Sequence, residues 1–565
     1  MPPAGSRPKA LARAGALAAV LLAVASYVVG LGNRCIPSIG DEPFYLQITR
    51  RTAEAGSLLP LRSDAGITDT KPPLLFWQGI ASTRWARDWE LFRLRLPVVL
   101  LTFATAGVVA WLTRRATGSG SAALVAGLVF LGFRSTIQQG RPFLTNAGET
   151  LFLFLPLALV VARRRSGVAL ALACGLSLGV AALFKSFFLL LPATLGLALV
   201  LLRRERWRVR DLAARHGAFL VLAPAIGLAL FALWPLLDPR PDLVLSQFVV
   251  GENASKLKAA GYLAGLVSGP WPIWRIWLGD VANAGLYAPL VVALLVDLWK
   301  RRRILSELEQ DLWLWTLAFL AVYSVPSQRQ ENYLLPTCAA LAVLVAVRWH
   351  ALPALAFRVP LAALAAAAAL VPVLEDRLEV ALGPGMFGAG AWIAPVAIAA
   401  VAAAGAVRVE LGRAALPHLA VAALLAVAGF LAPFAAAFPE AALGEIRGRP
   451  VLFPDRFLHA EELYRFVAPG ADVRGYPCPH GPERCPPPPP GAGHAALLLE
   501  VGEPIPAGWE PIAELPQLKQ RHSPEQIRQL AGGRIELLAE RLVLARPAPV
   551  AASRAGRNGL ATAPP

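Results

Sequence analysis

Two adjacent carboxylates, Asp41 and Glu42, follow the first long apolar stretch of the sequence, in "SIGDEPFYLQITR". A carboxylate at a membrane surface can act as a general base and take a proton from a hydroxyl group. About 30 residues further on, Lys71 precedes two prolines in "TDTKPPLLFW". The prolines forbid a helix that runs through this segment, so we expect Lys71 at a loop-to-helix corner, where a fixed ammonium group suits a phosphate.

A second lysine, Lys185, stands alone in the apolar run "GVAALFKSFFLLLPA". A cation in such a run costs free energy unless it has a partner, so we expect one nearby. Further polar residues occur at the ends of other apolar runs: Arg141, Glu149, Glu252, Lys256, Arg329 and Tyr333. Taken singly, Glu252 and Arg329 are explained equally well as ordinary loop charges.

The composition identifies an integral membrane protein. Of the 565 residues, 56% are hydrophobic and only 16% are charged, and the mean hydropathy is +0.54, which exceeds what one soluble core needs. Uncharged stretches recur at lengths near the ~20 residues that cross a hydrocarbon core of ~30 Å. They lie near residues 14–33, 96–113, 166–184, 217–237 and 281–296. The first is interpreted as a retained helix rather than a signal peptide, because no small-residue cleavage site precedes Arg34.

The net charge of +17 is concentrated between the apolar runs, in "TRRA", "ARRRSG", "RRERWRVR" and "KRRR". Such clusters are typical of cytoplasmic loops, so the charge reflects topology rather than nucleic-acid binding. With the N-terminus also cytoplasmic, the loop at residues 34–90 and the polar residues named above fall on the external side of the membrane. The same count predicts an all-α polytopic protein with about 13 transmembrane helices.

The composition changes after Phe438, where charges, prolines and short β-like runs appear. We therefore predict a transmembrane domain over residues 1–438, a small external α/β domain over 439–547 and a disordered tail over 548–565. A structural cap is the favoured role of the small domain over substrate binding. Cys478 and Cys485 could pair in an oxidising compartment, whereas a metal site with His480 lacks the further ligands of a closed zinc site.

Six segments occur in an order that resembles a known family. They are "DEPFYLQITR", "KPPLLFW", "GRPFLTNAGETLFLFL", "AALFKSFFLLLP", "GENASK" and "SQRQENYLLPTCAALAVL". Together they resemble the polyprenyl-phosphate-sugar-dependent glycosyltransferases, which include the 4-amino-arabinose lipid A transferases and the protein O-mannosyltransferases. The resemblance covers about residues 10–350.

The resemblance implies a GT-C-type fold in the inner (plasma) membrane and a catalytic first external loop, residues 34–90. Asp41 matches the catalytic base, and Glu42 shares the acidic pair and positions or assists it. Lys71, Lys185 and Tyr333 match contacts to the donor phosphate, with Arg141 as a further candidate. The remaining expected substrate or cation contacts are Tyr45, Asp69, Glu149, Glu252 and Lys256.

The implied activity is an inverting transfer of a sugar from a polyprenyl phosphate, undecaprenyl phosphate in a bacterium, to a lipid or protein acceptor on the external face. A hydroxyl acceptor loses a proton as it attacks the anomeric carbon, which requires a base. The leaving phosphate gains negative charge, which nearby cations stabilise. Membrane lipids are the other expected partners, and nucleic acid is not.

The sequence also departs from the family pattern. Thr70 stands where the aminoarabinose branch has an acidic residue, Phe44 where it has a basic one, and Asn146 where many relatives have Asp. No histidine precedes His216, which argues against a histidine-containing metal site in the first loops. A divalent cation held by Asp64, Asp69 and Glu42 is compatible with the sequence but not required. These departures leave the sugar and the acceptor open.

Two other classes of function remain in view. A flippase or transporter for lipid-linked sugars would also need many spans and cations near a phosphate, but such proteins place polar residues at the midplane and contain repeated halves. A non-catalytic scaffold predicts that Asp41 can be replaced without consequence. For the individual residues, the alternatives are interfacial snorkelling of the lysines and an aromatic-belt position for Tyr333.

Overall fold

The computed structural model describes residues 7–35, 40–163, 167–253, 262–388, 390–455, 459–477, 497–500, 502–519 and 522–548. The chain divides into two compact units, Met1–Ala435 and Ala436–Pro565, close to the predicted boundary at residue 438. Each unit is described below by itself. Cys478, Cys485, His480, the proline run and the predicted tail lie outside the described residues, and so does Lys256.

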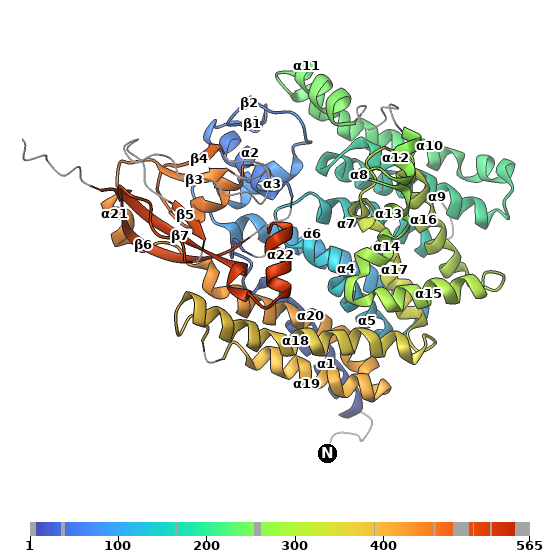
Figure 1. Ribbon diagram of the computed structural model, residues 1–565. Coiled ribbons are helices and arrows are strands. Elements are labelled where there is room, and N and C mark those ends of the chain that lie inside the picture. The colour runs from blue at the N-terminus through green and yellow to red at the C-terminus, as the bar shows by residue number, and fades with distance from the viewer. Residues whose placement is uncertain are drawn as a thin grey trace, which may run out of the picture. The chain divides into compact units, whose positions relative to one another are not determined.

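The first unit is almost entirely helical (Figure 1). Its first ten helices are α1 (Arg7–Val28), α2 (Glu42–Glu54), α3 (Leu74–Ser82), α4 (Leu91–Thr117), α5 (Gly120–Gly132), α6 (Arg134–Gly140), α7 (Asn146–Ala162), α8 (Val168–Phe184), α9 (Leu190–Arg204) and α10 (Val209–Leu237). The next are α11 (Pro241–Leu243), α12 (Tyr262–Val267), α13 (Ile273–Trp277), α14 (Gly279–Ala284), α15 (Ala288–Lys300), α16 (Glu307–Ser324), α17 (Leu335–Arg348), α18 (Ala354–Leu382), α19 (Ile393–Val407) and α20 (Val409–Leu431). A helix falls on each of the five uncharged stretches.

The apolar helices make this an integral membrane protein with fewer clear spans than predicted. Among the described residues, seven helices are long and apolar enough to cross a membrane, and the bent pair α5 and α6 brings the number to eight. Four more apolar helices have only 10–17 residues: Arg13–Val28, α7, α8 and α19. By length and composition the structure therefore supports 7 or 8 spans rather than about 13, because several apolar helices are short.

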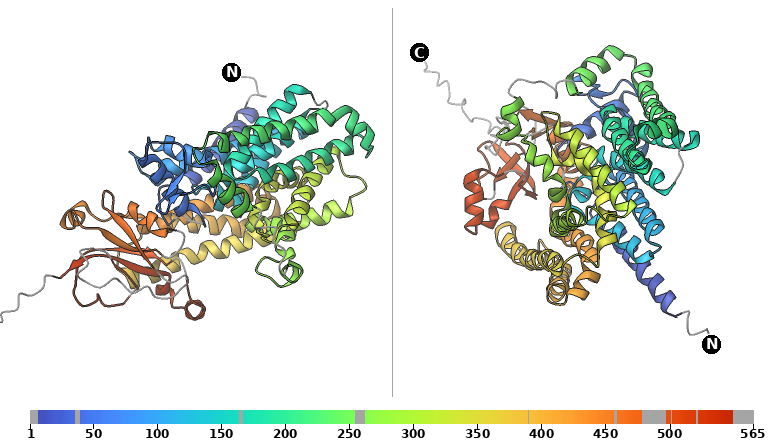
Figure 2. Two further views of the ribbon diagram at one scale, coloured as in Figure 1. Left: turned by 90° about the horizontal axis from the view of Figure 1, so that it is seen from above. Right: turned by 90° about the vertical axis from the view of Figure 1, so that its right-hand side faces the viewer.

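Helix α17 lies at the centre of the helical packing. All its residues from Leu335 to Ala346 are buried, and it packs against α4, α5, α7 and α16. Most of its side chains are small or branched apolar groups, which allow neighbouring helices to approach. Figure 2 shows the long helices of this unit running alongside one another. The short helix η5 (Glu331–Leu334) leads directly into α17 and places Tyr333 at its N-terminal end.

The segment over residues 34–90 folds into short elements rather than spans. It contains α2, the antiparallel pair β1 (Arg62–Ser63) and β2 (Gly66–Ile67), and α3. Pro43 occupies the first turn of α2, where proline's missing N–H has no helical partner to lose. Helix α3 begins only after Pro73, so Lys71 lies at a loop-to-helix corner as the two prolines predict.

The second unit contains two small sheets. Strands β3 (Val451–Asp455) and β4 (Val473–Pro477) pair in parallel, and β5 (Leu497–Glu500), β6 (Trp509–Leu518) and β7 (Ala539–Pro547) form an antiparallel sheet in the order β5-β7-β6. The helices are α21 (Glu440–Glu445), η7 (Ala460–Phe466), α22 (Pro524–Ala531) and η8 (Ile535–Leu538). A core around Val451, Phe453, Val467 and Leu544 joins the first sheet to β7.

Candidate functional site

A buried ion pair fixes the start of α2. The guanidinium of Arg95 on α4 donates two hydrogen bonds to the Glu42 carboxylate, each of 2.7 Å, and neither side chain exceeds 1% exposure. Glu42 Oε1 also accepts a 2.7 Å bond from the Phe143 backbone N–H, and Arg95 donates to the carbonyls of Leu31 and Asn33. Glu42 therefore joins the segments before α2, before α7 and after α1, and its position supports the positioning role that the sequence suggests.

Asp41 lies on the other side of the same turn. It precedes the first residue of α2 and is partly exposed, and its Oδ2 accepts a 3.1 Å hydrogen bond from the Tyr45 hydroxyl one helical turn later. The Tyr45 ring packs edge-on against Phe76 of α3, with ring centroids 5.7 Å apart. Burial, together with the nearby charge of Asp41, raises the pKa of Tyr45 well above its usual range, so the phenol keeps its proton and donates it toward the carboxylate.

Lys71 and Lys185 each hold a carboxylate. Lys71 Nζ lies 2.9 Å from Glu252 Oε2, and Lys185 Nζ lies 2.6 Å from Glu149 Oε2. Glu149 is fully buried at the start of α7 and also accepts from the Asn146 amide at 3.3 Å. The partner that an apolar setting demands of Lys185 is thus Glu149, and Asn146 supports that carboxylate rather than replacing it.

The two lysine pairs lie in one neighbourhood with Asp41. The charges of Asp41, Glu149 and Glu252 all act on Tyr45, and the same three charges act on Tyr333. The ring of Tyr333 also lies 5.4 Å from Lys185 Nζ, within the range of a cation–π contact. We call Asp41, Tyr45, Lys71, Glu149, Lys185, Glu252 and Tyr333 the carboxylate–lysine centre.

Local packing brings these segments together. Ser186 Oγ donates to Asn253 Oδ1 at 3.1 Å, which ties the end of α8 beside Lys185 to the π-helix η2 (Val244–Asn253) that carries Glu252. Gly148 leaves room for the Phe184 ring, which a Cβ at that position would approach to 2.6 Å. This close approach brings the first turn of α7, with Glu149, next to the end of α8.

Arg141 makes its contacts elsewhere. It is only 1% exposed and donates to the carbonyls of Tyr27 and Val29, at 3.3 Å and 3.1 Å, at the C-terminal end of α1. A cation there satisfies carbonyls that the helix leaves unpaired. We therefore assign Arg141 to the structure of α1 and do not include it among the phosphate contacts.

Asp69 forms a separate buried acid. It has no exposed surface, and neither carboxylate oxygen has a hydrogen-bond partner, although its backbone N–H donates to Gln247 Oε1 at 2.9 Å. Burial and the neighbouring Asp238 raise the pKa of Asp69 to about 7. Among the described residues, no group of three metal-ligand side chains contains Asp69 or Glu42, and Asp64 pairs with Arg51 instead.

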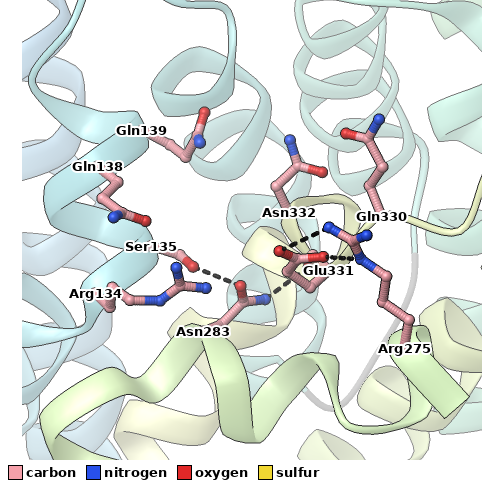
Figure 3. Close-up of a pocket in the computed structure, with 9 residues that line it drawn as sticks. All are labelled: Arg134, Ser135, Gln138, Gln139, Arg275, Asn283, Gln330, Glu331 and Asn332. Atoms are coloured by element: carbon pink, nitrogen blue, oxygen red, sulfur yellow. Dashed lines mark hydrogen bonds and ion pairs between the residues drawn. The ribbon is translucent and has the colours of Figure 1, made fainter. Parts of the chain in front are cut away.

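A polar pocket of about 300 Å³ opens beside this centre (Figure 3). Its lining contains Arg134, Ser135, Gln138, Gln139, Arg275, Asn283, Gln330, Glu331 and Asn332. Glu331 accepts from Arg275 at 2.7 Å, and its carbonyl accepts from the Asn283 amide at 2.7 Å. Asn332 Oδ1 is buried without a partner. Such a lining of amides and guanidinium groups suits a ligand rich in hydroxyl groups.

Sequence analysis did not identify this pocket or Arg95. The residues of the pocket come from α6, α13, α14 and η5, and only "STIQQG" and "SQRQEN" carry a visible concentration of amides. Arg95 has a clearer signal, because it stands in "LFRLRLPVVLL" at the start of a predicted span. A cation there calls for a partner as strongly as Lys185 does.

The fold belongs to a class of polytopic membrane proteins with a known representative. The chain is similar to the crystal structure of ArnT from Cupriavidus metallidurans bound to undecaprenyl phosphate, with a TM-score of 0.57 and 19% identity over 81% of this chain and 85% of that one. The apo ArnT structure from the same organism gives a TM-score of 0.57 and 18% identity over 82% and 86% of the two chains. No protein-family model and no curated protein sequence matches. The resemblance noted from the sequence motifs is confirmed at the level of the fold.

We expect Glu42→Gln to destabilise the protein strongly, because it leaves the Arg95 guanidinium buried and uncompensated. Loss of one partner of such a pair costs about 3–5 kcal/mol. Glu54→Gln is the matched control, since Glu54 is 45% exposed in its pairs with Arg50 and Arg51, and exposed pairs contribute ~0–1 kcal/mol. Thermal unfolding of the purified variants tests this. Equal midpoints for the two variants would contradict the anchoring role of Glu42.

We expect Asp69 to make stability fall as pH rises. Because its pKa is raised from near 4 to about 7, the folded chain holds a proton between these values that the unfolded chain has released, so folding is favoured at the acidic end. Asp69→Asn removes this dependence. Its unfolding midpoint should therefore exceed the wild-type midpoint by more at pH 8 than at pH 5, while Asp64→Asn shows no such trend. A constant difference across this range would argue against a buried, unpaired Asp69.

Proposed function

We propose that the chain transfers a sugar from a polyprenyl phosphate to an acceptor on the external face of the inner membrane, with inversion at the anomeric carbon. The observation that carries the proposal is the carboxylate–lysine centre. It combines a partly exposed carboxylate at Asp41 with two ammonium groups, Lys71 and Lys185, that come from separate segments. A similar fold that binds undecaprenyl phosphate in ArnT supports the choice of donor.

Asp41 is the base in this proposal. Its carboxylate takes the proton of an acceptor hydroxyl as that oxygen forms a bond to the anomeric carbon. The bond between this carbon and the phosphate oxygen breaks on the opposite side, and the polyprenyl phosphate leaves with the electron pair. The hydrogen bond from Tyr45 orients the Asp41 carboxylate and leaves its second oxygen for the acceptor.

The two lysines stabilise the leaving phosphate. An ammonium group has three N–H donors, and the contact to Glu252 or Glu149 uses one of them. The carboxylates hold the ammonium groups in place, and the remaining donors are free to meet the phosphate oxygens as negative charge develops. The hydroxyl of Tyr333, next to Lys185, is a further donor to the same oxygens.

The polar pocket provides a place for the sugar ring. Asn332 lines the pocket and Tyr333 contacts Lys185, so neighbouring residues of η5 connect the two regions. Amide and guanidinium groups match hydroxyl groups in hydrogen-bond character. We assign to the pocket a sugar ring of the donor or the acceptor.

We expect Asp41→Asn to lose sugar transfer by about 10²–10⁴-fold while the protein still folds, since a general base contributes an effect of that size. The control is Asp64→Asn, which removes an exposed carboxylate from the same loop. Mass spectrometry of envelope lipids and glycoproteins, from cells with each variant and from cells without the protein, reports the product. Wild-type amounts of product with Asp41→Asn would remove the assignment of the base.

We expect Lys71→Gln and Lys185→Gln each to weaken binding of undecaprenyl phosphate by roughly tenfold or more, the effect of losing a hydrogen bond to a charged group. Lys185→Arg should retain part of the affinity because it keeps the charge. Lys300→Gln, at the end of α15, is the matched control. Calorimetric titration of the purified protein with undecaprenyl phosphate measures these affinities. Unchanged affinity in both glutamine variants would place the phosphate elsewhere.

A further inference from the structure

Three potential ligands converge at the end of the parallel strands of the second unit. Asp455 is the last residue of β3, which pairs in parallel with β4, and His459 and Glu461 follow at the start of η7. The carboxyl ends of parallel strands are a common place for ligands, because loops leave the sheet there and side chains gather above its edge. None of these residues belongs to the carboxylate–lysine centre.

The ligand atoms lie at distances that a metal ion could bridge. His459 Nδ1 is 3.5 Å from Glu461 Oε1 and 4.0 Å from Asp455 Oδ2, and one ligand atom from each residue lies within 4.8 Å of the others. Ligands bound at the usual zinc distances of 2.0–2.2 Å stand roughly 3.4 Å apart in a tetrahedral site. Small side-chain movements of a few tenths of an ångström therefore complete the geometry.

Two oxygen atoms of this cluster have no hydrogen-bond partner although they are buried. They are Asp455 Oδ1 and Glu461 Oε2, and Glu461 as a whole is only 5% exposed. A buried carboxylate oxygen without a partner is costly unless a cation satisfies it. The neighbouring Glu462 differs, because Arg465 donates to it at 3.0 Å.

The backbone around the cluster makes room for it. A Cβ at Gly475 of β4 would lie 3.1 Å from both Asp455 Cβ and the Glu461 side chain, so a larger residue there would crowd the two carboxylates. His459 has a φ of +63°, in the left-handed region that a histidine seldom adopts. This conformation turns the imidazole back toward Asp455 and Glu461.

We propose that Asp455, His459 and Glu461 bind a divalent transition-metal ion, Zn²⁺ in the first instance. The imidazole nitrogen selects against Ca²⁺ and Mg²⁺, which prefer oxygen ligands alone. One imidazole and two carboxylates suit Zn²⁺, and three protein ligands leave a fourth position for water or another group. The site is independent of the proposed sugar transfer and gives the second unit a binding function of its own.

The experiment measures metal bound to the purified full-length chain. The protein is stripped with a chelator, dialysed against Zn²⁺ and analysed by plasma mass spectrometry, with Ca²⁺ in a parallel dialysis. We expect one Zn²⁺ per chain and no comparable uptake of Ca²⁺. His459→Ala and Asp455→Asn should each weaken zinc binding at least about tenfold. Asp472→Asn, a 57% exposed carboxylate in the same unit, should bind like the wild type.

Two further arms keep the result interpretable. Cys478→Ser/Cys485→Ser tests whether zinc is held instead by the cysteine segment, and this variant should retain the bound zinc. Zinc should also raise the unfolding midpoint of the wild type but not of His459→Ala, and circular dichroism shows whether each variant is folded. The proposal is overturned if folded His459→Ala and Asp455→Asn bind zinc as the wild type does, if only the cysteine variant loses it, or if the wild type binds none.

Discussion

The Glu42–Arg95 ion pair is the contact on which the first external loop depends. Two charges are buried together because each satisfies the other with two hydrogen bonds and because Phe143, Leu31 and Asn33 satisfy the rest. A pair of this kind stabilises little relative to apolar packing, but breaking it is costly. It therefore specifies one arrangement of α2 against α4, and that arrangement turns the preceding residue, Asp41, away from Arg95.

The same rule of compensation governs the charges around Asp41. Glu149 and Glu252 hold the two lysines, and elsewhere Arg203 and Arg204 share Asp311. Charges in a largely apolar protein are tolerable when paired. Asp41 differs because its described hydrogen bond comes from a neutral phenol, Tyr45. A carboxylate that is oriented without being neutralised by a cation retains its basicity, which is what proton abstraction needs.

The sequence predicted the site best where local rules apply. The two prolines after Lys71 determine a helix start, and the apolar run around Lys185 demands a partner, so both lysines could be placed without knowing the fold. Glu42 and Arg141 could not be placed in the same way. Their environments depend on Arg95 and on the end of α1, which are distant in sequence. The span count failed for a related reason, since apolar composition does not show where a helix will break, as α5 and α6 do.

The central claim is that Asp41, Lys71 and Lys185 act on one phosphate-linked substrate. An experimental structure of the chain with undecaprenyl phosphate tests it most directly. The account predicts the phosphate within hydrogen-bond distance, ~3 Å, of both Lys71 Nζ and Lys185 Nζ, with the Asp41 carboxylate facing the position of the sugar. A phosphate bound away from both lysines, with Asp41 on another surface, would contradict it.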